Sequence, residues 1–296
     1  MSIASKYGYA PDKEAIGRQL ERIAASLEEI ASEQVYKACF GIMDQTTLAS
    51  EDTPQSVKAM VEKVNGLSQA YPDFPLPASC CVYPNFASVV AQTRGSKDLH
   101  VTCVAGCFPS SQSFLEVKLH EIELAVRGGA DEIDIVLPLN SFLAGDYAAA
   151  GAEVKASRET IDKVAAQLGR TVILKVILET GLLSTPELIA DASFLAMENG
   201  ADFIKTSTGK VKVNATPQAA YVMCECIKKY YEATGKKIGF KPAGGVSSAL
   251  DAVCYWTIVK SILGPDWLNK DLFRFGVSSL ANKLLSAVRG ETVAYF

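Results

Sequence analysis

Two lysines end neighbouring apolar runs of this sequence. Lys205 lies in ADFIKTS, and Lys241 occupies the corresponding place in KIGFKPAGG. If these runs are adjacent strands, they lie about 4.8 Å apart, and the two amines come within mutual reach. Two cations this close disfavour each other's protonation, and loss of hydration acts in the same direction. We therefore expect one of the two lysines to have a lowered pKa.

A lysine that is neutral at physiological pH is a nucleophile toward carbonyl groups. The pair therefore predicts imine (Schiff-base) chemistry on an aldehyde or ketone, of which carbon–carbon cleavage is the commonest metal-free use. The chain has only His100 and His120, and its eight cysteines do not follow the usual zinc-ligand spacings. This composition argues against a zinc-dependent aldolase and favours reduced cysteines that pack as small apolar residues.

Further ionisable residues lie within or at the end of other apolar runs. Asp44 ends YKACFGIMD, Asp134 lies within DEIDIVLP, and Lys175 and Glu179 lie within and at the end of TVILKVILE. A single buried charge of this kind is explained by a structural ion pair as readily as by a functional role. Several buried charges in one interior instead indicate that they pair with one another, for example Asp134 with Lys175, and that they serve a function where the strands end.

Small, glycine-rich segments follow the last three apolar runs. They read Thr208-Gly209-Lys210, Gly244-Gly245-Val246-Ser247-Ser248 and Gly276-Val277-Ser278-Ser279. Any one of them alone is adequately explained as a turn. Three in succession favour a phosphate site, because backbone N–H groups at such loops and at helix N-termini bind anions.

Short apolar runs alternate with helical stretches along the chain, and these elements must position the residues above. Eight runs occur, over residues 36–44, 78–84, 100–109, 131–138, 171–179, 201–207, 237–245 and 272–279. Strands that are apolar on both faces indicate a parallel sheet, and eight strand–helix units predict an α/β fold of the (β/α)₈ barrel type. A doubly wound open sheet is the alternative, but no GxGxxG or Walker-type loop supports it.

We predict one barrel domain over residues 1–296. A helical extension covers about residues 1–34, with a helix over about 12–32. The formal net charge of -4, with both signs interspersed, argues against a nucleic-acid surface. No apolar stretch is long enough for a bilayer, and the N-terminus lacks a secretory signal, so a cytoplasmic protein is expected.

Seven segments together resemble deoxyribose-phosphate aldolase, a metal-free class I aldolase family of the (β/α)₈ class. They are MDQTTL (43–48), CVYP (81–84), DEIDIVLP (131–138), LKVILETG (174–181), GADFIKTSTGKVKVNATP (200–217), GFKPAGGV (239–246) and FRFGVSSL (273–280). The resemblance implies reversible cleavage of 2-deoxy-D-ribose 5-phosphate into D-glyceraldehyde 3-phosphate and acetaldehyde, in deoxyribonucleotide catabolism. It implies no cofactor and no metal.

The same resemblance implies roles for individual residues. Lys205 would form the Schiff base, Lys241 would lower its pKa, Asp134 would move protons through a water, and Lys175 would support Asp134. The substrate-binding positions implied are Asp44, Thr46, Cys81, Thr208, Gly209, Lys210, Gly244, Gly245, Gly276, Ser278 and Ser279.

Three positions depart from the family pattern. Ser247 stands where many members have a basic residue, the chain ends Tyr295-Phe296 rather than in tyrosine, and the loop GCFPSS lacks a glycine after its proline. These departures and the N-terminal helix motivate an alternative, an aldolase-fold protein with weak or altered activity that mainly binds another protein. A different Schiff-base enzyme, transaldolase-like or a keto-acid aldolase, is a third reading. The sequence leaves a homodimer and a protein partner open.

Overall fold

Eight parallel strands form the centre of the molecule in a computed structural model that describes residues 2–296. The sheet order is β7-β6-β5-β4-β3-β2-β1-β8, and two isolated bridges, Phe240 with Phe273 and Ala243 with Gly276, join β7 to the β8 side and close the barrel. The strands are β1 (Met43–Thr46), β2 (Ser79–Val82), β3 (His100–Val104), β4 (Glu132–Val136), β5 (Ile173–Ile177), β6 (Phe203–Lys205), β7 (Gly239–Lys241) and β8 (Phe275–Val277). The predicted (β/α)₈ barrel is confirmed.

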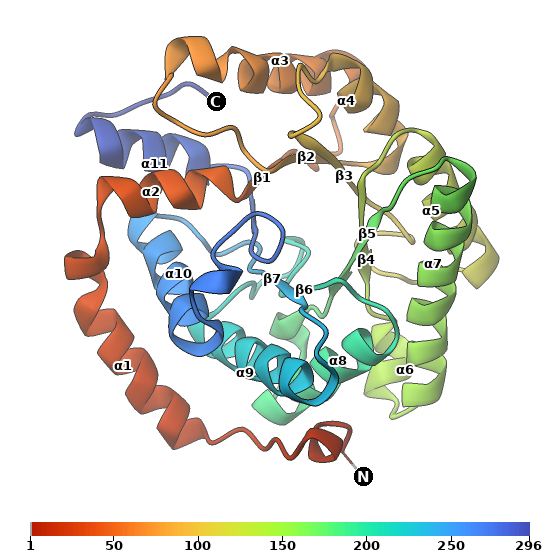
Figure 1. Ribbon diagram of the computed structural model, residues 1–296. Coiled ribbons are helices and arrows are strands. Elements are labelled where there is room, and N and C mark those ends of the chain that lie inside the picture. Colours follow the sequence, from red (N-terminus) through yellow and green to blue (C-terminus); the bar gives the residue numbers. More distant parts are fainter. Residues whose placement is uncertain (1) are drawn as a thin grey trace.

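A ring of helices surrounds these strands (Figure 1). The helices of the ring are α3 (Pro54–Ala70), α4 (Ala87–Thr93), α5 (Leu115–Arg127), α6 (Leu139–Leu143), α7 (Tyr147–Gln167), α8 (Pro186–Glu198), α9 (Pro217–Thr234), α10 (Ala249–Leu263) and α11 (Leu280–Arg289). Three of them begin at a Thr-Pro step, where the threonine side chain accepts a backbone N–H of the first turn and proline occupies the first helical position.

The prediction for the first apolar run is wrong over most of its length. Residues up to Gly41 belong to helix α2 (Glu33–Gly41), and β1 begins only at Met43. The Ser32 side chain accepts the Val35 N–H, so this segment has a helix N-cap that the apolar run obscured. Asp44 therefore lies inside β1 rather than at its end.

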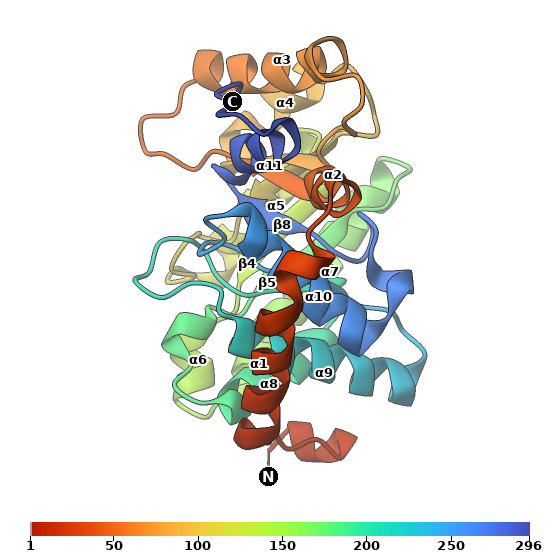
Figure 2. The same cartoon turned by 90° about the vertical axis from the view of Figure 1, so that its left-hand side faces the viewer.

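The N-terminal segment packs on the barrel's own helices. After a short 3-10 turn (Ala4–Tyr7), helix α1 (Lys13–Ile30) lies beside α9 and α10 (Figures 1 and 2). The Tyr7 ring stacks on Phe194 of α8 with 4.3 Å between ring centroids, and Asp191 accepts the Ala4 N–H. The apolar face of α1 is thus used within the chain.

The barrel lumen is unusually rich in charge. Such lumens are ordinarily filled by branched apolar side chains. Here seven ionisable residues form one set of ion pairs, and each residue is at most 3% exposed. We call this set the lumen network: Asp44, Glu132, Asp134, Lys175, Lys205, Lys241 and Arg274. Because a buried charge is costly, this arrangement is hard to explain by packing alone.

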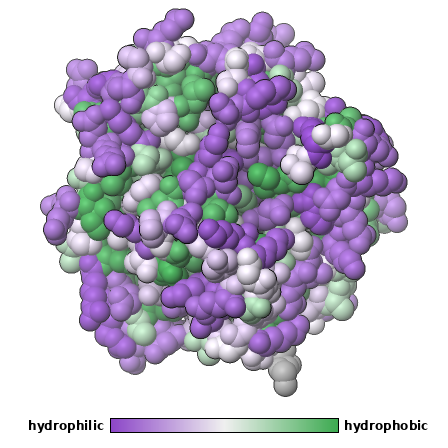
Figure 3. All heavy atoms as spheres, in the orientation of Figure 1, coloured by the Kyte–Doolittle hydropathy of each residue, from purple (hydrophilic) through white to green (hydrophobic). Residues whose placement is uncertain are grey.

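One face of the molecule is mainly hydrophilic. On the face shown in Figure 3, hydrophilic residues predominate and hydrophobic residues form small groups between them. Among residues 2–296, no helix is both long enough and apolar enough to cross a bilayer.

Candidate active site

Lys205 and Lys241 are direct neighbours in the sheet register. They are the last residues of β6 and β7, and their Cα atoms are paired across the two strands. Both Nζ atoms contact the same carboxylate oxygen, Oδ2 of Asp134, at 2.8 Å for Lys205 and 2.9 Å for Lys241. The two amines are therefore close together at the C-terminal end of the barrel, where enzymes of this architecture carry their chemistry.

The carboxylate of Asp134 is the hub of this cluster. Its second oxygen, Oδ1, accepts a bond of 2.9 Å from Lys175, which is its register partner on β5. The three lysines around it hold the pKa of Asp134 far below its usual range, although burial acts in the opposite direction. Asp134 is thus an anion within hydrogen-bond reach of Lys205, which is the geometry that a proton carrier needs.

The two neighbouring lysines have opposite pKa shifts. Burial, and then the nearby Lys241, lower the pKa of Lys205, while Asp134 only partly opposes them. Burial also favours neutral Lys241, but Asp134 and Asp44 outweigh it and raise the pKa of Lys241. The difference follows from the number of partners, because Lys241 contacts two carboxylates and Lys205 contacts one. Lys205 is therefore the amine that most easily becomes neutral and nucleophilic.

Glu132 and Arg274, which were not predicted as site residues, complete the network at the opposite end of the barrel. Arg274 donates to Asp44 at 2.7 Å and to both oxygens of Glu132, at 2.6 and 3.1 Å. Glu132 also contacts Lys175. Each of these two residues precedes a singled-out residue, Asp134 or Gly276, by two positions. Alternation along a strand puts such pairs on one face, and this was the signal that could have found them.

A cavity of about 540 Å³ opens above the lysine pair. Ten predicted site residues line it: Thr46, Lys205, Thr208, Gly209, Lys210, Gly244, Gly245, Gly276, Ser278 and Ser279. The other predicted residues do not line it but lie buried in the barrel: Asp44, Cys81, Asp134, Lys175 and Lys241. The cavity wall also includes Thr47, Leu48, Asn214 and Ser247, which were not predicted as binding residues.

Glu179 fixes the loop that carries the predicted phosphate-site residues after β6. Its carboxylate accepts the N–H and the hydroxyl of Thr208, and the Thr208 hydroxyl oxygen in turn accepts the Lys210 N–H. Glu179 has φ +53, a left-handed conformation that a non-glycine residue adopts at some cost. Its side chain is buried, which raises its pKa. The Thr208–Lys210 segment is thus held in place by hydrogen bonds to a residue with a strained backbone.

Two of the three departures from the family pattern, Ser247 and the C-terminal Tyr295-Phe296, make defined hydrogen bonds, and so does the neighbouring Lys210. Ser247 gives its N–H and hydroxyl to Asp251 at the start of α10. Lys210 reaches across to the Leu48 carbonyl at 2.6 Å. At the C-terminus, the Tyr295 hydroxyl donates to the Lys63 carbonyl on α3 at 2.8 Å, and Asn282 holds the last two residues. This tail lies near α3 and α11 (Figure 1), and neither Tyr295 nor Phe296 is among the residues that line the cavity.

Gly276 has no room for a side chain. A Cβ at this position would lie 2.8 Å from the Ala243 Cβ and 2.9 Å from the Lys241 Cε. Gly276→Ala should therefore displace Lys241 and lower the free energy of unfolding by about 1–3 kcal/mol, as overpacking does. Thermal unfolding and the rate of covalent adduct formation would measure both effects. Gly17→Ala, on α1 with open space around it, is the control: it should leave the adduct rate unchanged and raise the free energy of unfolding by up to about 1 kcal/mol, because alanine is the better helix former. An unchanged Gly276→Ala variant would contradict the geometry.

Comparisons with known proteins agree on one family. Residues 40–261 match the model of the DeoC/LacD family aldolases. A Caenorhabditis elegans protein, provisionally named a deoxyribose-phosphate aldolase, is 38% identical over 279 residues, which cover 94% of this chain and 89% of that protein. A solved deoxyribose phosphate aldolase from Aeropyrum pernix, described as a tetramer, has a TM-score of 0.62 at 26% identity, with 93% of this chain and 98% of that one covered.

A solved structure from Toxoplasma gondii, provisionally assigned to the same aldolases, has the same fold. Its TM-score is 0.72 at 21% identity, and 87% of this chain and 95% of that one are covered.

Proposed function

This chain belongs to the DeoC/LacD family of aldolases, which are carbon–carbon lyases, and from that membership we propose that it reversibly cleaves 2-deoxy-D-ribose 5-phosphate. The products would be D-glyceraldehyde 3-phosphate and acetaldehyde. The observation that carries the proposal is the buried Lys205 amine, which lines the cavity and has a lowered pKa beside Lys241 and Asp134. The proposal includes a role in cytoplasmic breakdown of deoxyribose phosphates.

In the proposed reaction, neutral Lys205 attacks the C1 aldehyde of the open-chain sugar. Loss of water from the carbinolamine gives an imine, which acts as an electron sink. Removal of the C3 hydroxyl proton then breaks the C2–C3 bond and releases the phosphorylated aldehyde. The remaining enamine takes a proton at C2, and hydrolysis of the imine releases acetaldehyde and regenerates the amine.

Asp134 is the proposed proton carrier for these steps. Its Oδ2 lies 2.8 Å from the Lys205 Nζ, so a water beside it would reach the oxygens that lose or gain protons. Lys175 and Lys241 keep this carboxylate ionised and oriented. Lys241, held as a cation by Asp44 and Asp134, helps keep Lys205 neutral.

The phosphate is proposed to bind at the rim formed by the loops after β6, β7 and β8. The cavity lining there offers Gly209, Gly244 and Gly245, each with a positive φ, together with Ser278 and Ser279. Within the described chain, Lys210 is the only cation in the cavity lining besides Lys205. Cys81, Asp44 and Thr46 would act near the reacting carbons, below or beside the cavity.

A borohydride trap tests this function. Incubation with 2-deoxy-D-ribose 5-phosphate and borohydride should leave a covalent adduct that peptide mapping locates at Lys205. If no adduct forms with this sugar but one forms with keto acids or unphosphorylated ketoses, the chain is another Schiff-base enzyme.

The protein-binding alternative has less support, since the apolar face of α1 already packs against α9 and α10.

Lys210→Met should weaken binding of the phosphorylated sugar selectively. Loss of one charge-assisted contact should raise KM for 2-deoxy-D-ribose 5-phosphate about 10- to 100-fold and leave the kinetics with unphosphorylated 2-deoxyribose nearly unchanged. Steady-state kinetics with both sugars would measure the difference. Lys212→Met, an exposed change two residues further on, is the matched control. An equal rise in KM for the two sugars would show that Lys210 does not belong to the phosphate site.

A further inference from the structure

The lumen network has an almost balanced charge. Its four cationic side chains are Lys175, Lys205, Lys241 and Arg274, and its three carboxylates are Asp44, Glu132 and Asp134. When Lys205 is neutral, three cations face three carboxylates. When Lys205 is protonated, the buried network has one surplus positive charge, which is costly for groups largely removed from water. The charge balance itself thus favours the amine form of Lys205.

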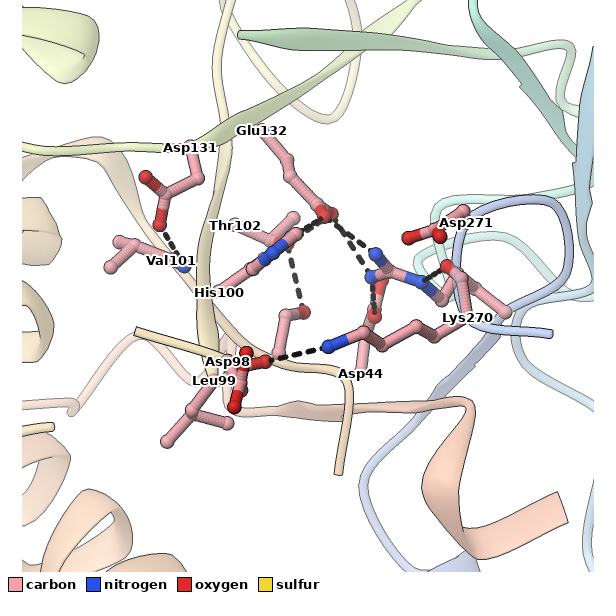
Figure 4. Close-up of polar contacts among 12 residues, drawn as sticks. Asp44, Asp98, Leu99, His100, Val101, Thr102, Asp131, Glu132, Lys270 and Asp271 are labelled. Atoms are coloured by element: carbon pink, nitrogen blue, oxygen red, sulfur yellow. Dashed lines mark hydrogen bonds and ion pairs between the residues drawn. The ribbon is translucent and has the colours of Figure 1, made fainter. Parts of the chain in front are cut away.

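Arg274 is the cation of this set that lies furthest from the proposed chemistry. It precedes β8, and its guanidinium is bound at the N-terminal end of the barrel by Asp44 of β1 and Glu132 of β4. The Phe203 ring of β6 lies under it at 5.9 Å, and the Lys270 carbonyl accepts its Nε–H. In Figure 4, dashed lines join one guanidinium group to the carboxylates of Glu132 and Asp44 and to the Lys270 carbonyl. No direct contact joins Arg274 to Lys205.

Glu132 and Asp44 connect the two ends of the lumen. Besides Arg274, Glu132 contacts Lys175 of β5, and His100 and Thr102 of β3, the last two at 2.6 and 2.8 Å. Asp44 contacts Lys241 as well as Arg274. Without Arg274, both carboxylates would have to share the lysines that now neutralise Asp134.

We propose that Arg274 is a positioning residue for Schiff-base formation: it occupies Asp44 and Glu132, so that no surplus negative charge in the lumen retains the proton on Lys205. This inference rests on the proposed function. Lys205 itself is faced by Asp134 of β4, Lys241 of β7 and Cys81 of β2, and Glu179 lies after β5. Of these groups, only Asp134 contacts both Lys205 and Lys241, so charge changes at Arg274 reach the amine through the ion pairs.

The test is the pH dependence of adduct formation at Lys205, with acetaldehyde and borohydride as the probe and peptide mapping as the readout. For the wild-type protein, the rate should rise with pH as the amine loses its proton. Arg274→Met should move the midpoint up by about one pH unit, the order of effect expected when one unit charge is removed from a buried network of effective dielectric constant about 20. Below the midpoint, the adduct should form about tenfold more slowly.

Three further variants separate the effect of charge from an effect on folding. Glu132→Gln removes a negative charge and should move the midpoint down by a similar amount. The double variant Glu132→Gln/Arg274→Met restores the balance and should return the midpoint to the wild-type value, as should Arg274→Lys. Arg127→Met, which breaks an exposed pair with Glu123, is the control and should shift nothing.

The outcomes distinguish this inference from the function on which it rests. Wild-type protein that forms no adduct rejects the proposed function and this inference with it. Wild-type protein that forms the adduct, with the same midpoint in Glu132→Gln and Arg274→Met, overturns only the role of Arg274. If Arg274→Met fails to fold, Glu132→Gln decides alone, since an unchanged or raised midpoint in that variant contradicts the charge-balance argument.

Discussion

Replacement of Lys205 with alanine should abolish both adduct formation and aldol cleavage. Removal of the nucleophile from a covalent catalyst lowers turnover by about 10⁵-fold or more. The fold should persist, because Asp134 keeps its contacts with Lys175 and Lys241 after the change. Coupled assay of aldehyde release, borohydride trapping and circular dichroism would measure activity, adduct and folding on one preparation.

The control for this experiment is Lys260→Ala, an exposed lysine near the end of α10. Its activity and its adduct at Lys205 should equal those of the wild-type protein. An Lys205→Ala variant that still turns over the sugar would show that the proposed nucleophile is wrong. An adduct that moves to Lys241 in this variant would show instead that either lysine can serve.

Asp134→Asn should separate adduct formation from turnover. The amide keeps the size of the side chain but cannot accept and deliver protons as a carboxylate does, and loss of such a group costs about 10²- to 10⁴-fold. Asp134 raises the pKa of Lys205, so its removal should lower that pKa further and leave the amine neutral over a wider pH range. We therefore expect Lys205 to be trapped in this variant while cleavage of the sugar is nearly lost.

The same change should destabilise the protein. Lys175 keeps Glu132 and Lys241 keeps Asp44 as partners, but loss of Asp134 leaves three buried cations facing two carboxylates even when Lys205 is neutral. This surplus of buried positive charge should cost about 3–5 kcal/mol. Chemical denaturation of Asp134→Asn beside Asp131→Asn would measure it, since Asp131 is a partly exposed carboxylate with two arginine partners outside the lumen network. Turnover that falls in proportion to the adduct would contradict a separate role in proton transfer.

The positions of the strands could be read from the sequence because the signals are local. Apolar runs such as DEIDIVLP and Thr-Pro helix starts depend on neighbouring residues, and the strand–helix order gave the barrel. The one wrong assignment, at residues 36–41, arose because an apolar run fits a buried helix as well as a strand. There the Ser32 cap and tertiary packing favoured the helix.

By itself, the sequence determined which residue types end the strands. It therefore indicated the Lys205–Lys241 pair and the glycine-rich loops, because parallel strands put their carboxyl ends at one edge. Only the tertiary structure decided which buried cation pairs with which buried carboxylate. Barrel closure brings Arg274 to Asp44, 230 positions earlier in the chain, and makes Asp134 the common partner of three lysines. The protonation of Lys205 depends on burial and on that sum of charges, which no local pattern encodes.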